Sequence, residues 1–121
     1  MSEMSCMNVV VLQGALCREP EERVLPSGDR LVAYEVRVQA VGRAAETVPV
    51  AWLDAPSRAA ELAAGEAVVV TGRVRRRFFR AGGVTQSRTE VVADAVIPAR
   101  RRATVRKAVA AALDAIRSAG G

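Results

Sequence analysis

The chain has 121 residues, half of them apolar, which is enough for one domain with a single hydrophobic core but hardly for two. Its formal net charge is +5, yet residues 1–98 carry twelve arginines and twelve acidic residues, whereas residues 99–121 carry six Arg or Lys against Asp114 alone. The body is therefore neutral and the tail basic. Any surface of the body that binds an acidic partner must arise from segregation of charge between its faces.

The sequence lacks the residues that several classes of functional site require. The sequence has no histidine, and its two cysteines, Cys6 and Cys17, form no C-x-x-C pair or other metal-ligand spacing. Two thiols do not indicate the disulfide framework of a secreted domain, and residues 1–8 show no basic segment followed by an apolar stretch. We therefore expect no metal, no cofactor, no membrane span and a reducing cytoplasm. Whether the two thiols ever bond stays open.

Five segments rich in valine or with alternating polarity are predicted as strands: residues 8–16, 31–41, 46–53, 67–79 and 84–97. A turn at residues 26–29 separates the first two, and Ala81-Gly82-Gly83 is the hairpin turn between the last two. The Ala-rich segment 56–64 begins with proline and is followed by Gly65, so it predicts one short helix.

Three strands, a short helix and a long hairpin are the order of a five-stranded Greek-key OB barrel, in which the helix fills the gap between strands three and four. The sequence thus predicts an all-β OB domain over residues 1–98. Residues 99–121 form a basic tail in which apolar residues recur at helical spacing, namely Val105, Val109, Ala112, Leu113 and Ile116. We expect a basic amphipathic helix, packed on its own barrel or on a second subunit in preference to binding phosphates or a membrane surface.

Motifs along this barrel resemble those of bacterial single-stranded-DNA-binding proteins. An N-x-V strand, a Gly-x-Leu, an acidic-Pro turn and a Pro-Ser-Gly hairpin stand in order within residues 7–38. Downstream, Val70-Thr71-Gly72-Arg73-Val74-Arg75 and Thr89-Glu90-Val91-Val92 resemble the strand-four and strand-five motifs of that family. The resemblance covers roughly residues 7–97, about one whole OB domain. It implies a non-enzymatic homo-oligomer, a tetramer or dimer, that binds single-stranded DNA in replication, recombination or repair at the nucleoid.

Binding a single strand requires a cationic track for phosphates and flat apolar faces for bases. Strand alternation places Arg73, Arg75, Arg77 and Phe79 on one face of the fourth predicted strand. On the family pattern, Arg75 and Arg77 fall on basic positions, Phe79 on a stacking aromatic, and Arg23 on a basic residue before the Pro-Ser-Gly turn. The other interpretation of this arginine-rich strand is a solvated edge protected by charge.

The third strand and the tail depart from the family pattern. Val48 and Asp54 stand where the family commonly has a stacking Trp and a Phe. Trp52 is an even number of residues from both, so it lies on the same face of the strand. It is either a base platform displaced along the groove or a packing residue, and the two interpretations have equal weight. The tail lacks the acidic tip typical of the family. With aromatics only 3% of the chain, we expect binding that depends steeply on salt.

The predicted DNA-binding residues are therefore Arg23, Arg73, Arg75, Arg77, Phe79 and Trp52. The alternative function is an OB module for protein interaction, in which Val48, Val50 and Trp52 form an exposed apolar face for a partner and DNA binding is weak or lost. An enzyme acting on a small-molecule substrate is not supported. The sequence shows no plausible nucleophile with a base and no phosphate-cradling glycine loop.

Overall fold

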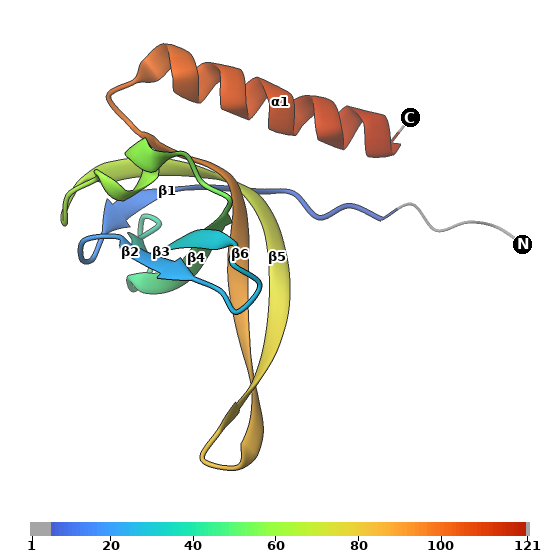
Figure 1. The fold of residues 1–121 in the computed structure, drawn as a ribbon. Helices are drawn as coiled ribbons and strands as arrows, with labels where there is room; N and C mark the ends of the chain where they lie inside the picture. The colour runs from blue at the N-terminus through green and yellow to red at the C-terminus, as the bar shows by residue number, and fades with distance from the viewer. Residues whose placement is uncertain (1–5, 121) are drawn as a thin grey trace, which may run out of the picture.

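A computed structural model describes residues 6–120 of the chain. Residues 1–5 of the predicted OB domain and Gly121 of the predicted tail lie outside this range. Six strands, one 3₁₀ turn and one helix follow each other along the chain: β1 (Val10–Leu16), β2 (Glu21–Val24), β3 (Arg30–Val38), β4 (Glu46–Leu53), η1 (Ser57–Ala60), β5 (Ala67–Ala81), β6 (Val84–Pro98) and α1 (Arg102–Gly120). Figure 1 shows a curled sheet with α1 on one side and a long hairpin extending from the other.

Five of the strands close into a barrel. They follow the order β1-β5-β6-β4-β3, and β1 returns to pair with β3 at Ala15 and Leu16. Neighbouring strands are antiparallel except β4 and β6, which pair in parallel at Val50–Val91 and Ala51–Val92. The predicted five-stranded OB barrel with a C-terminal helix is confirmed.

The sequence missed one strand. β2 pairs with the start of β3 and extends the sheet beyond the barrel. Its residues, Glu-Glu-Arg-Val, are all exposed, so no alternation of apolar and polar residues marks them as a strand. The strand forms because the turn after Leu25 brings this segment back alongside β3, with the Leu25 N–H donating to the Asp29 carbonyl at 2.8 Å.

The predicted helix over 56–64 is wrong in extent. Only Ser57–Ala60 is helical, as a single 3₁₀ turn, and the Glu61 N–H donates to the Arg58 carbonyl to close it. A segment of nine residues is too short to be a stable helix through propensity alone. Beyond the turn, the Ala63 N–H donates to the Glu66 carboxylate at 3.2 Å, so the backbone leaves the helical path and turns through Gly65 into β5.

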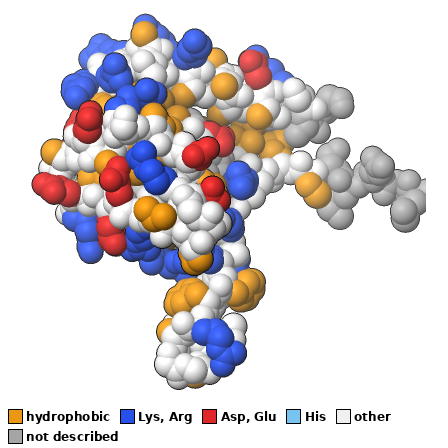
Figure 2. All heavy atoms as spheres, viewed as in Figure 1, with side chains coloured by type: hydrophobic (Ala, Val, Ile, Leu, Met, Phe, Trp, Pro, Cys, Tyr) orange, Lys and Arg blue, Asp and Glu red, His pale blue; other side chains and the backbone are white. Residues whose placement is uncertain are grey.

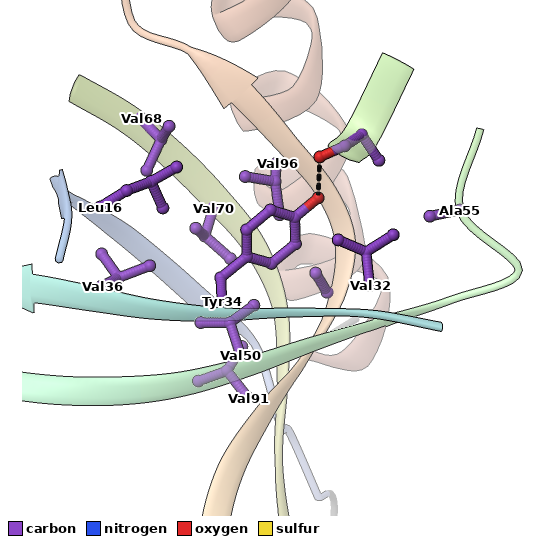
Figure 3. Close-up of a cluster of buried hydrophobic side chains, with 12 residues drawn as sticks. Leu16, Val32, Tyr34, Val36, Val50, Ala55, Val68, Val70, Val91 and Val96 are labelled. Carbon is purple, nitrogen blue, oxygen red and sulfur yellow. Dashed lines mark hydrogen bonds between the residues drawn. The ribbon is translucent and has the colours of Figure 1, made fainter. Parts of the chain in front are cut away.

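Valines from β3, β4, β5 and β6 fill the core together with Leu16 from β1, and Tyr34 lies among them (Figure 3). Its hydroxyl donates to the Ala59 carbonyl at 2.7 Å, drawn as the dashed line in Figure 3, and so ties η1 to the barrel. Burial raises the pKa of the Tyr34 phenol, which therefore stays protonated and able to donate well above neutral pH.

Replacing Tyr34 with phenylalanine is expected to lower the free energy of unfolding by about 1–3 kcal/mol, because the buried Ala59 carbonyl would lose its donor. Urea denaturation of the two proteins at neutral pH measures the difference. Equal midpoints and slopes would mean that the hydroxyl contributes nothing to holding η1 on the barrel.

Candidate nucleic-acid interface

The β5–β6 hairpin extends beyond the barrel as an arm. β1 pairs with β5 only as far as Gly72, and β4 pairs with β6 only at Val91 and Val92. From there outward the two strands pair only with each other, and we call residues 73–81 and 84–90 the β5–β6 arm. Its tip is the two-residue turn Gly82-Gly83, with φ of 60° and 80°, as a tight hairpin of type I′ requires.

One face of the arm carries three of the predicted binding residues. Arg75 and Arg77 both reach the carboxylate of Glu90, and the Arg77 guanidinium lies 5.4 Å from the centroid of the Phe79 ring. Alternation along β5 thus predicted correctly that these three side chains share a surface. The opposite face exposes the larger part of the Phe78 ring, 67% accessible, an aromatic that the sequence interpretation did not single out.

Glu90 organises this face, and the sequence interpretation missed it. Its side chain is only 6% exposed, and its two oxygens accept from the Arg75 Nη2 at 2.7 Å and the Arg77 Nε at 3.1 Å. The sequence did hold a signal for the contact. A two-residue turn at Gly82-Gly83 fixes the register so that Arg75 lies opposite Glu90.

A groove of about 280 Å³ runs between this face and the outer surface of β3 and β4. We call it the arm groove. Its cationic residues are Arg23, Arg75, Arg77 and Arg88, and its apolar wall is formed by Leu25, Leu31, Pro49, Ala51 and Leu53. Arg88 was not among the predicted residues. The sequence therefore located part of this groove, and β3, β4 and β6 supply most of the rest.

Every arginine of the arm groove has a carboxylate partner. Arg23 pairs with Glu21 and Arg88 with Glu35, each at 3.0 Å. The hydrogen bond from Arg23 lowers the pKa of the Glu21 carboxyl, since each charge stabilises the other. The Nε of Arg75 is buried and has no acceptor within residues 6–120. Phosphates entering this groove would exchange with carboxylates and not meet bare cations.

The other two predicted residues lie elsewhere. Trp52 is partly buried against the core, on the same side of β4 as Val48 and the fully core residue Val50. The prediction that Val48, Val50 and Trp52 form an exposed apolar face is therefore wrong, because this side of the strand points into the barrel. The Trp52 side chain emerges where β4 ends, under α1, and not in the arm groove.

Arg73 also lies under the helix, although it has the parity of Arg75. It lines a hollow of about 350 Å³ with Asn8, Thr71 and residues of α1. β5 bends strongly as it passes from the barrel into the arm (Figure 1), so residues of one nominal face point in different directions. The structure thus separates the six predicted residues. Arg23, Arg75 and Arg77 line the arm groove with Phe79 beside them, while Arg73 and Trp52 lie under α1.

Helix α1 covers the outer surface of the barrel beside β1, β5 and β6 (Figure 1). Its half-buried residues are Val105, Ala108, Val109, Ala112 and Ile116, whereas Leu113 is 46% exposed. The predicted amphipathic helix is confirmed, with Ala108 in the stripe in place of Leu113. Figure 2 shows Lys and Arg side chains gathered around the start of this helix at the top of the molecule.

In a comparison with protein families, residues 7–98 match the single-strand binding protein family. That range contains the whole barrel and the arm groove. The chain belongs to the single-strand binding protein family. Membership supports single-stranded DNA as its partner, and the family's proteins are non-enzymatic. A comparison with curated proteins gives no match.

The family match ends at Pro98, so α1 and its basic residues lie beyond it. Within residues 6–120, no helix is long and apolar enough to cross a membrane. In the same part of the chain, no cluster of three or more His, Cys, Asp or Glu could hold a metal ion.

Proposed function

We propose that this chain binds single-stranded DNA without reading its sequence, as a non-enzymatic protein of replication, recombination or repair. It would act in the cytoplasm at the nucleoid and as a homo-oligomer. The observation that supports the proposal most strongly is the arm groove. It aligns four arginines along an apolar wall, with the Phe79 ring beside Arg77, in a chain that belongs to the single-strand binding protein family. Cationic tracks combined with aromatic faces bind single strands of any sequence.

Phosphates would bind by exchange. Arg75 and Arg77 are 35% and 42% exposed, so a phosphate can approach their outer N–H groups while Glu90 holds the inner ones. Arg23 pairs with the exposed Glu21, and such a surface pair contributes little stability, so exchanging it for phosphate costs little. Arg88 pairs with the half-buried Glu35 and is itself 43% exposed, so a phosphate can reach it from outside.

Bases would lie against the Phe79 ring. Arg77 already stacks on this ring and would brace it while its charge meets a neighbouring phosphate. Each base stacked on an aromatic side chain contributes about 1–3 kcal/mol, and a duplex keeps its bases unavailable for such contacts. Preference for a single strand therefore rests on Phe79 and the exposed Phe78, whereas affinity rests on the arginines.

Fluorescence anisotropy of a labelled oligo-dT and of a matching duplex, titrated at several salt concentrations, tests the proposal. We expect at least about tenfold tighter binding to the single strand and an affinity for it that falls linearly with salt on logarithmic axes. Equal, weak binding of both nucleic acids would contradict single-strand binding as the function of the chain.

A further inference from the structure

A hollow of about 590 Å³ lies between α1 and the barrel. It adjoins the hollow that contains Arg73, since both are bordered by Asp94, Ala95, Ala108 and Ala111. We call the two together the α1 cleft. Its floor includes Trp52, Leu62, Val96 and Ile97. This volume lies within the range of about 300–1,000 Å³ that accommodates small organic ligands.

The cations of the α1 cleft are mostly unpaired, unlike those of the arm groove. Its walls include five basic residues, Arg58, Arg73, Arg100, Arg101 and Lys107, and only two acidic ones, Glu61 and Asp94. Of these cations, only Arg100 forms a salt bridge within residues 6–120, with Glu66 at 3.5 Å. Four positive charges therefore face the cleft without a carboxylate partner. Such a concentration of unpaired charge attracts an anion.

Trp52 supplies a flat aromatic face in the same place. It is the single tryptophan of the chain, is only partly buried, and forms no hydrogen bond within the described residues. A partly exposed tryptophan ring presents a flat apolar face on which another flat group can stack. An aromatic face surrounded by unpaired cations is the chemistry that binds a base together with its phosphates.

The α1 cleft and the arm groove approach each other at the end of β4. Leu53 lines the arm groove and its neighbour Trp52 lines the cleft, because successive residues of a strand point to opposite faces. A single strand leaving the arm groove would need to pass only around this strand end to enter the cleft. The two sites can thus hold consecutive stretches of one strand.

We propose that the α1 cleft is a second binding site for single-stranded DNA, in which a base stacks on Trp52 and phosphates bind Arg58, Arg101 and Lys107. This inference rests on the proposed function and deepens it. Because Arg101 and Lys107 lie beyond the family match, the C-terminal tail contributes a part of the path that the barrel alone lacks. Nucleic acid fits better than an acidic peptide, which would use the cations but has no particular need of a flat ring.

The full chain offers a direct readout, because any change in tryptophan fluorescence comes from Trp52. We would titrate the protein with an oligo-dT of about 30 nucleotides, longer than the roughly 4–16 that one OB fold holds. Tryptophan emission and the anisotropy of a labelled copy of the oligonucleotide would be recorded in parallel. We expect emission to be quenched as anisotropy rises.

The variant Arg101→Glu/Lys107→Glu should lose most of this quenching and bind about tenfold more weakly at low salt. The matched control is Arg102→Glu/Arg106→Glu, which makes the same charge change on the same helix at exposed residues that do not border the cleft. The control should keep the quenching and lose at most about threefold in affinity, since only the long-range field changes.

Four results would overturn the inference. If anisotropy rises without a change in Trp52 emission, or if both double variants weaken binding equally, the α1 cleft does not hold the strand and the arm groove alone accounts for binding. If an acidic peptide with apolar residues changes Trp52 emission where oligo-dT does not, the cleft belongs to a protein partner. If anisotropy does not rise at all, the proposed function fails and this inference with it.

Discussion

Replacing Gly72 with alanine is expected to lower the free energy of unfolding by about 3 kcal/mol or more. A Cβ at this position would collide with the Val92 carbonyl oxygen and lie 2.9 Å from the Ala93 Cα. Both are backbone atoms of the neighbouring strand, so no side chain can move aside to relieve the clash. β5 and β6 would have to separate where the register between them already shifts. Thermal unfolding followed by circular dichroism should show a loss on the order of 10 °C.

Gly82→Asn is the matched control for this prediction. Gly82 has a φ of 60°, and a Cβ there would meet no atom within 4 Å. Asparagine tolerates this left-handed conformation, and Asn-Gly is a favoured pair in a type I′ turn. The free energy of unfolding of the control should therefore lie within about 0.5 kcal/mol of that of the unchanged protein. An unchanged melting temperature for Gly72→Ala would show that β5 and β6 do not approach each other so closely.

The elements that the sequence predicted correctly are those whose signal is local. The long hairpin followed from valine-rich strands on either side of Gly82-Gly83, and the tail helix from apolar residues at helical spacing. β2 was missed because it is held by its partner strand and buries none of its own side chains. The helix over 56–64 was predicted too long because the helix propensity of alanine is a local signal. The hydrogen bonds that shape this segment join it to Tyr34, which is distant in sequence, and to Glu66, which lies beyond its end.

The candidate site divides in the same way. Alternation placed Arg75, Arg77 and Phe79 together because they are neighbours on one straight stretch of strand. It failed for Arg73, the first residue of the arm, which lies where β5 bends away from the barrel, and it could not decide which side of β4 faces the core. That choice depends on how the barrel closes, and closure decides that Trp52 lies under α1. The unpaired cations there come from η1, β5 and the tail, segments far apart in sequence.

Glu90 determines how the arginines of the arm should be tested. Reversing the charge of Arg75 and Arg77 would place two carboxylates beside a buried third one, and removing the partners of a buried charge costs about 3–5 kcal/mol. A loss of DNA binding in such a variant could then reflect unfolding. Replacing Arg75, Arg77 and Glu90 with glutamine removes the two arginine charges and the buried carboxylate together. The glutamine side chains can still hydrogen bond to one another.

We therefore expect Arg75→Gln/Arg77→Gln/Glu90→Gln to remain folded and to bind oligo-dT about 100-fold more weakly than the single variant Glu90→Gln at low salt. Two charge-assisted contacts with phosphate are lost, each corresponding to about tenfold in affinity. The salt dependence should fall as well, by about 1.4 in the slope of log affinity against log salt, because each phosphate contact on a single strand contributes about 0.7.

The single variant Glu90→Gln carries the opposite prediction. It leaves Arg75 and Arg77 in place but removes the carboxylate that competes with phosphate for them, so binding to oligo-dT should tighten by about three- to tenfold at low salt. Anisotropy titrations of the three proteins at matched salt measure both effects. Should the triple variant bind as tightly as the single one, the arm does not contact the strand, because the only charges that distinguish the two proteins are those of Arg75 and Arg77.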